Sequence, residues 1–221
     1  MMNRAGVLRA LGCVAVAGAT LMRGTPVFAQ PVPEPIGPFA ADVRVSLPRF
    51  PDDVSIASAL GVASTNLPTR GLGLAAGVNW YPFRMGAITV GLGGEVLLSR
   101  GSRTAESQDD APAGPVVNTR FAALSPQVSL NFGTGRGWSY LSGGLGPGAF
   151  TSEREDEPVG EAASRPRVLN YGGGARWFAK EHLAFVLDLR FYTIDAQEAT
   201  IDRPAYPKMR MMVFSAGVSF K

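Results

Sequence analysis

From Phe39 onward, apolar and polar residues alternate with a period of two in about eight short stretches, and no helical run stands among them. The first stretch shows the pattern clearly, because every second residue from Phe39 to Leu47 is apolar while Asp42 and Arg44 share the other face. The alternation predicts strands over residues 39–47, 72–80, 88–98, 120–132, 138–146, 168–178, 183–192 and 209–220.

The connections between these strands alternate between two lengths. Short turns near Pro82, Gly133 and Ala179 are expected on one side. Long polar segments fall at residues 48–70, 101–119, 149–167 and 193–208, with one or two helical turns expected at 53–60. Loops beyond about 12 to 15 residues are uncommon in compact soluble domains, whereas outer-membrane barrels combine short periplasmic turns with long outer loops. The rhythm therefore predicts an all-β, eight-stranded antiparallel up-and-down transmembrane β-barrel.

Aromatic residues gather at the strand ends beside the short turns. An interfacial aromatic girdle is typical of membrane barrels, and the alternative is that these residues are ordinary core residues at strand ends. The candidate girdle residues are Trp80, Phe132, Trp138, Trp177 and Phe178.

Two stretches carry a resemblance to a known group of proteins. Residues 170–178, NYGGGARWF, and 187–192, LDLRFY, resemble the OmpA transmembrane domain and the OmpX-like eight-stranded outer-membrane barrels. The resemblance is one of pattern over residues 30–221, and it implies a last strand that the outer-membrane assembly machinery recognises. That strand offers Phe214, Val218 and Phe220 on one face, but Lys221 stands where such proteins end in an aromatic residue. No peptidoglycan-binding domain follows, so the tethering role of full-length OmpA is not expected.

The polar faces of the strands carry charges that would point into the barrel. An eight-stranded barrel is only wide enough for its own side chains to fill, so these charges should pair across the lumen and form a plug. A narrow gated ion path, in which the pairs exchange partners, is the alternative. The expected network consists of Asp42, Arg44, Glu95, Arg176, Asp188 and Arg190.

The first 29 residues have the three parts of a secretory signal peptide. Arg4 and Arg9 precede an apolar stretch at 10–22, and residues 27–29 offer a small-residue cleavage site. An uncleaved anchor, or a lipoprotein signal ending at Cys13, are the alternatives. Residues 30–38, with four prolines, are expected to be an extended lead-in to a barrel domain at 39–221. Three of the 21 basic residues lie in the signal, so 18 basic and 18 acidic residues remain after it. This balance of charge does not indicate nucleic-acid binding.

Candidate chemistry is sparse in this chain. The one histidine, His182, lies in a predicted turn beside Lys180 and Glu181, with no neighbouring serine nucleophile. No His or Cys cluster has metal-ligand spacing, and the glycine-rich stretches 71–73 and 144–146 do not continue into a phosphate loop. An acidic cluster at 153–161 could bind calcium weakly, or be a solvated loop. We therefore expect no enzyme, no cofactor and no metal.

Together these patterns predict a monomeric, exported protein of the outer membrane of a Gram-negative-type cell. Its expected role is structural or adhesin-like, through the four outer loops, with an unidentified extracellular partner. Its other expected partners are outer-membrane lipid, lipopolysaccharide and the assembly machinery. A small pore or transporter is one alternative function. A soluble, lipocalin-like binder of an apolar ligand is another, and it would turn the apolar faces inward.

Overall fold

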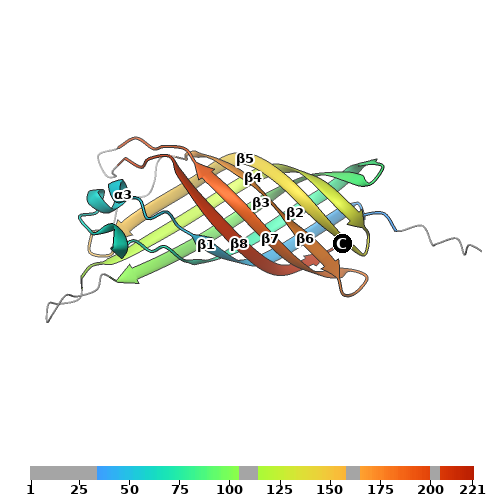
Figure 1. The fold of residues 1–221 in the computed structure, drawn as a ribbon, viewed down its shortest axis with the longest axis horizontal. Coiled ribbons are helices and arrows are strands. Elements are labelled where there is room, and N and C mark those ends of the chain that lie inside the picture. Colours follow the sequence, from blue (N-terminus) through green and yellow to red (C-terminus); the bar gives the residue numbers. More distant parts are fainter. Residues whose placement is uncertain (1–33, 105–113, 158–164, 200–204) are drawn as a thin grey trace, which may run out of the picture. The chain divides into compact units, whose positions relative to one another are not determined.

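A computed structural model describes residues 34–104, 114–157, 165–199 and 205–221. The proposed signal peptide at 1–29, and residues 30–33 of the lead-in, lie outside the described residues. Eight strands form a closed barrel in the order of the sequence, each antiparallel to its neighbours, and β8 pairs with β1 to complete it (Figure 1). The strands are β1 (Phe39–Arg49), β2 (Leu72–Met85), β3 (Ile88–Thr104), β4 (Val116–Thr134), β5 (Gly137–Arg154), β6 (Arg167–Phe178), β7 (Leu183–Ile194) and β8 (Met209–Phe220). The predicted fold class is confirmed.

Three strands reach further toward the long loops than the sequence indicated. The predicted loop starts at residues 101 and 149 fall inside β3 and β5, and β4 begins at Val116 rather than Arg120. The β3–β4 pairing continues to Thr104 opposite Val116, and the β4–β5 pairing to Val117 opposite Arg154. Polar side chains do not interrupt a strand whose backbone is hydrogen-bonded to a neighbour, so the apolar pattern ends before the hydrogen-bonded ladder does.

The first long connection contains the predicted helical turns. Helix α3 (Val54–Ala59) is capped by Asp53, whose side chain accepts a hydrogen bond from the Ser55 amide at 2.8 Å. A short 3-10 helix, η1 (Ser64–Asn66), follows it. Within the described residues, no helix is long and apolar enough to cross a membrane.

The strand faces alternate as the sequence indicated. Bulky apolar residues point outward, and Leu74, Val78 and Phe185 are each more than half exposed. The polar faces point into the barrel, where Asp42 and Glu95 are buried. This orientation is the reverse of a soluble barrel that holds an apolar ligand, so the lipocalin-like alternative is wrong.

Glycines on the inner face allow this barrel to be narrow. A Cβ atom at Gly217 of β8 would meet the carbonyl oxygen of Val43 and lie 2.6 Å from the Cα atom of Arg44. Because both contacts are with backbone of the neighbouring β1, no rotation of a side chain would relieve them. The absence of a side chain at Gly217 therefore leaves room for Arg44 at the junction that closes the barrel.

Candidate functional site

The six charged residues expected in the lumen all lie there, and each is at most 3 % exposed. They come from four strands and comprise three carboxylates and three guanidinium groups, namely Asp42 and Arg44 of β1, Glu95 of β3, Arg176 of β6, and Asp188 and Arg190 of β7. Equal numbers of opposite charges allow every buried charge to be compensated, which a low-dielectric interior requires.

Arg44 occupies the centre of this network. Its Nε lies 2.7 Å from Asp42 Oδ1, and its Nη1 lies 3.2 Å from Asp188 Oδ1. Its Nη2 contacts the carboxylate of Glu95. One guanidinium group thus joins carboxylates from three strands, β1, β3 and β7, and so connects opposite walls of the barrel.

Arg190 joins two of the same carboxylates to polar residues of the facing wall. Its Nε lies 2.9 Å from Asp188 Oδ1 and 3.3 Å from Glu95 Oε2. Its Nη1 donates to Gln127 Oε1 at 2.8 Å, and its Nη2 donates to the hydroxyl of Ser142 at 2.9 Å. The network therefore extends across β3, β4, β5 and β7.

Arg176 forms the end of the network nearest the short turns. Its Nη2 donates to Asp42 Oδ2 at 2.6 Å, and its Nη1 donates to the Tyr81 hydroxyl at 3.3 Å. Its guanidinium carbon lies 4.6 Å from the ring centroid of Tyr140 and 5.7 Å from that of Trp138. Cation–π contacts of this kind partly replace the water that a buried arginine loses.

Tyrosines complete the network, a role that no pattern in the sequence indicated. The Tyr140 hydroxyl donates to Asp188 Oδ2 at 2.7 Å, and the Tyr192 hydroxyl donates to Glu95 Oε1 at 2.6 Å. Tyr192 follows Asp188 and Arg190 at intervals of two, so its shared inward face was visible in the sequence. Its carboxylate partner lies 97 residues away and was not.

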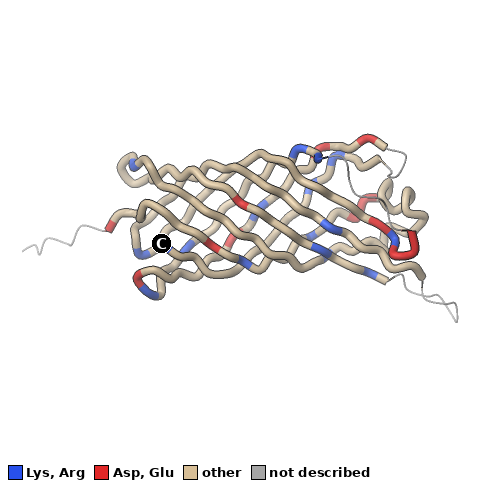
Figure 2. Tube along the Cα trace, turned by 180° about the vertical axis from the view of Figure 1, so that it is seen from behind, with Lys and Arg blue, Asp and Glu red and all other residues tan. Residues whose placement is uncertain are grey.

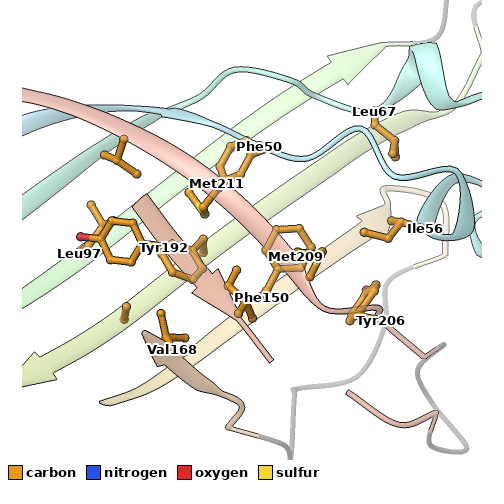
Figure 3. Close-up of a cluster of buried hydrophobic side chains, with 14 of the residues drawn as sticks. Phe50, Ile56, Leu67, Leu97, Phe150, Val168, Tyr192, Tyr206, Met209 and Met211 are labelled. Atoms are coloured by element: carbon orange, nitrogen blue, oxygen red, sulfur yellow. The ribbon is translucent and has the colours of Figure 1, made fainter. Parts of the chain in front are cut away.

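Apolar packing closes the lumen on the side of the long loops. The loop-end cluster combines inward residues of the strands with residues of the first connection that fold into the barrel mouth (Figure 3). Ile56 and Leu60 of the α3 region belong to it, and the rings of Phe150 and Tyr206 meet edge to face at 5.7 Å. The buried hydroxyls of Thr119 and Ser152 lie 3.0 Å apart beside this cluster, and the backbone amide of Ser152 donates to the Tyr206 hydroxyl. The mouth is therefore filled mainly by apolar side chains.

A second apolar cluster closes the lumen beside the short turns, and it corrects part of the predicted aromatic girdle. Trp138 is 3 % exposed and belongs to this turn-end cluster, where it stacks on Phe178 at 5.2 Å and meets Tyr81 edge to face at 5.8 Å. Both Trp138 and Phe178 are thus wrongly placed in the girdle. The outward-facing Leu141 sets the phase of β5, so the odd-numbered residues face out and Trp138 faces in.

The other three candidate girdle residues, Trp80, Phe132 and Trp177, are exposed on the outer face. The residues expected to mark the last strand also face outward, since Phe214 and Phe220 are exposed and Val218 is half-buried. Lys221 folds back to the turn end, where its amine donates to the Gly135 carbonyl at 2.7 Å and lies 4.6 Å from the ring centroid of Phe178.

Three acidic residues of the described part of the acidic segment lie beside arginines. Arg154 lies 2.5 Å from Asp156 and 3.9 Å from Glu157, and Arg120 lies 3.6 Å from Glu153. The hydrogen bond from Arg154 lowers the pKa of Asp156 below its ordinary value. Among the described residues, no three His, Cys, Asp or Glu side chains are grouped so as to hold a metal ion. Glu161 lies outside the described residues.

The histidine lies in the turn between β6 and β7. The Nε2 atom of His182 is 3.9 Å from Glu181 Oε1, and both side chains are largely exposed. Within the described ranges, Glu181 is the one carboxylate within ion-pair distance of this exposed imidazole, and a general base uses a closer, oriented partner.

Comparison with solved structures finds other eight-stranded barrels, although no protein-family model matches and no curated protein is significantly similar in sequence. The crystal structure of Neisserial surface protein A matches with a TM-score of 0.50 and 12% identity over 83% of this chain and 96% of that chain. OprG from Pseudomonas aeruginosa matches with a TM-score of 0.47 and 11% identity, over 85% and 97% of the two chains. Ail from Yersinia pestis, solved with the heparin analogue sucrose octasulfate, matches with a TM-score of 0.40 and 16% identity, over 84% and 99%.

At such low identity, a structural match shows the fold alone. The structure itself has the features of such a barrel, namely eight strands, a closed sheet and apolar residues on the outer face. The protein therefore has the fold of the eight-stranded outer-membrane β-barrel proteins.

Proposed function

We propose that this protein is a monomeric, non-enzymatic barrel of the outer membrane whose role, structural or adhesin-like, is carried out by its loop-end surface. The observation that carries the proposal is the filled lumen, because a filled lumen leaves the outer surfaces of the barrel as the parts that can contact other molecules. Residues 1–29 would direct export, and the assembly machinery would insert the barrel into the membrane.

The outer face supports placement in lipid. Lipid offers no hydrogen-bond partners to a backbone, and a closed barrel pairs all of its strands. Outward apolar residues extend from Phe39 to Leu47 on β1 and from Leu169 to Trp177 on β6. Stretches of this length match the roughly 9 to 11 residues with which a tilted strand crosses a bilayer.

The filled lumen argues against a pore or transporter. A solute would have to pass the loop-end cluster, then the charge network, then the turn-end cluster. The middle layer offers no spare charge to an ion, because three carboxylates face three guanidinium groups. Opening the mouth would also expose the apolar residues that α3 covers.

The loop end is the more elaborate end of the barrel. The first connection is built as a capped helix and a 3-10 helix, with Ile56 buried and Val54 exposed. The connections of the opposite end are short turns at residues 86–87, 135–136 and 179–182. Long connections that carry helices and both apolar and polar side chains are better suited to contact another molecule than these short turns are.

Two cysteine variants test this arrangement in cells. Asp156→Cys lies beyond β5 on the loop end, and Lys180→Cys lies in the turn between β6 and β7. A membrane-impermeant maleimide should label Asp156→Cys on intact cells and Lys180→Cys only after the outer membrane is permeabilised. The parent chain, whose one cysteine is Cys13, serves as the labelling background. The reverse labelling order would overturn the proposal that the loop end faces outward.

Two measurements on the purified protein test the remaining parts. A closed membrane barrel should migrate differently on a detergent gel with and without boiling, and lack of a shift would count against the membrane barrel. In planar bilayers we expect no steady conductance. A stable conductance step in the wild-type protein would overturn the plugged lumen and favour the pore.

A further inference from the structure

The charges on the outward face of the strands are distributed unevenly. The outward-facing basic residues of the strands lie where the strands approach the long loops, whereas Arg84, near a short turn, is paired in register with the buried Thr89. Figure 2 shows where positive segments lie along the chain. We call this set the arginine rim; it comprises Arg49, Arg100, Arg120, Arg167 and Arg210 of five strands, together with Arg70, which is bridged to Arg49. The one carboxylate on the outward face of the eight strands is Glu153.

Within the rim, arginines stand directly opposite one another. Arg100 of β3 is paired in register with Arg120 of β4, and Arg49 is bridged to Arg70. Like charges at opposed positions of neighbouring strands destabilise a sheet. Arg120 has a carboxylate 3.6 Å away, that of Glu153. Among the described residues, no carboxylate lies within ion-pair distance of Arg100. An anion from outside the protein would offset this repulsion.

An apolar groove lies directly below this part of the rim. One continuous row of paired outward residues crosses five strands, and it consists of Val45, Leu74, Leu98, Ala122 and Ala149. The row passes from bulky aliphatic side chains to two alanines, so the outer surface is hollowed there. The groove has a volume of about 880 Å³, and its charged edge is lined by Arg100, Arg120 and Arg165 together with Glu153, the partner of Arg120.

We propose that this groove and the adjoining rim bind a phosphorylated lipid of the outer leaflet, an inference that rests on the membrane position proposed above. An acyl chain lies along the apolar row, and a headgroup phosphate lies between Arg100 and Arg120. Guanidinium groups bind phosphate through paired, charge-assisted hydrogen bonds. The three arginines of the groove and Glu153 leave two positive charges, enough to neutralise a dianion. The apolar row selects a lipid over a soluble anion, because only an acyl chain covers it.

Lipid binding to variants in detergent tests the site, with diphosphoryl lipid A as the probe and native mass spectrometry as the readout. The test variant is Arg100→Gln/Arg120→Gln. The matched control, Arg84→Gln/Arg136→Gln, removes two exposed arginines from the turn end. We expect the apparent affinity of the test variant to fall about tenfold or more and that of the control to stay at the wild-type value. Arg100→Lys/Arg120→Lys should lie between, because lysine keeps the charge without the paired hydrogen bonds.

Dephosphorylated lipid A tests the role of phosphate. It should bind the wild type and the test variant equally weakly. Equal affinity of the two double Gln variants for diphosphoryl lipid A, or full binding of the dephosphorylated lipid, would overturn the inference and leave the rim as a marker of the bilayer boundary. Displacement by millimolar inorganic phosphate would overturn the role of the acyl chain.

The heat-dependent shift on a detergent gel separates this inference from the proposed function. Every variant should keep the shift, which shows that the barrel has folded. A wild-type barrel that shifts but does not retain lipid A overturns the lipid site alone, whereas a wild type that does not shift overturns the membrane barrel as well.

Discussion

Replacing Glu95 by alanine should destabilise the barrel strongly. The Glu95 side chain is buried, and its carboxylate contacts Arg44, lies 3.3 Å from Arg190 Nε, and accepts a hydrogen bond from Tyr192 at 2.6 Å. Glu95→Ala would leave three buried guanidinium groups facing two carboxylates. Removing one partner of a buried ion pair costs about 3 to 5 kcal/mol. We therefore expect the free energy of unfolding to fall by about that amount, or about 100-fold or more in the folding equilibrium.

A matched control lies on the neighbouring strand. Ser125 of β4 is paired in register with Glu95 and is equally buried, and its hydroxyl has no hydrogen-bond partner among the described residues. Ser125→Ala should therefore change the free energy of unfolding by about 1 kcal/mol or less. Glu95→Gln keeps the shape of the side chain and removes its charge, so its effect should lie between those of the two alanine variants.

The assay is equilibrium unfolding in urea of barrels refolded into phosphatidylcholine vesicles, followed by tryptophan fluorescence. The reasoning is refuted if Glu95→Ala and Ser125→Ala unfold with free energies within about 1 kcal/mol of each other. The double variant Glu95→Ala/Arg44→Met gives a second check. Because it removes one charge of each sign, its loss of stability should be smaller than the sum of the two single losses.

Three further predictions concern other parts of the barrel. Asp53→Ala should weaken α3 by about 1 kcal/mol, measured by amide exchange. Because the Ser55 hydrogen bond lowers the pKa of Asp53, the cap should act at neutral pH and be lost as the pH falls through that lowered pKa. In single-tryptophan variants, brominated lipids should quench the two outward tryptophans and leave Trp138 unquenched; equal quenching would place Trp138 in lipid. Gly217→Ala should reduce the yield of heat-modifiable barrel on a detergent gel, because the new methyl group meets backbone of β1; a wild-type yield would show that the junction can relax.

The faces of the strands could be predicted because they depend on local sequence. Successive side chains of a strand point to opposite sides, so one bulky apolar row fixes where every other residue points. Asp188 and Arg190 were placed in the lumen in this way, behind Leu187 and Leu189. The method failed at Trp138, because glycines at 143, 144, 146 and 148 leave the phase of β5 poorly marked.

The alternation of apolar and polar residues did not predict how far the strands extend beyond the membrane. Outside lipid, neither face must be apolar, so residues such as Ser102 and Asn118 can pair in a ladder without any period-two signal. The packing of the first connection into the barrel mouth was equally hidden. The helical turn at 54–59 could be expected from its residues, but Ile56 finds its apolar partners on strands distant in the sequence.

The number of strands, their order and the face on which each charge lies follow from the alternation and the connection lengths along the chain. Which charges meet depends on the closed barrel. Arg176 and Asp42 are 134 residues apart, and Arg44 and Glu95 are 51 apart. Their contact depends on the stagger of all eight strands around the closed sheet, which sets the height of each side chain in the lumen. The same stagger aligns Arg100 with Arg120 and so creates the arginine rim.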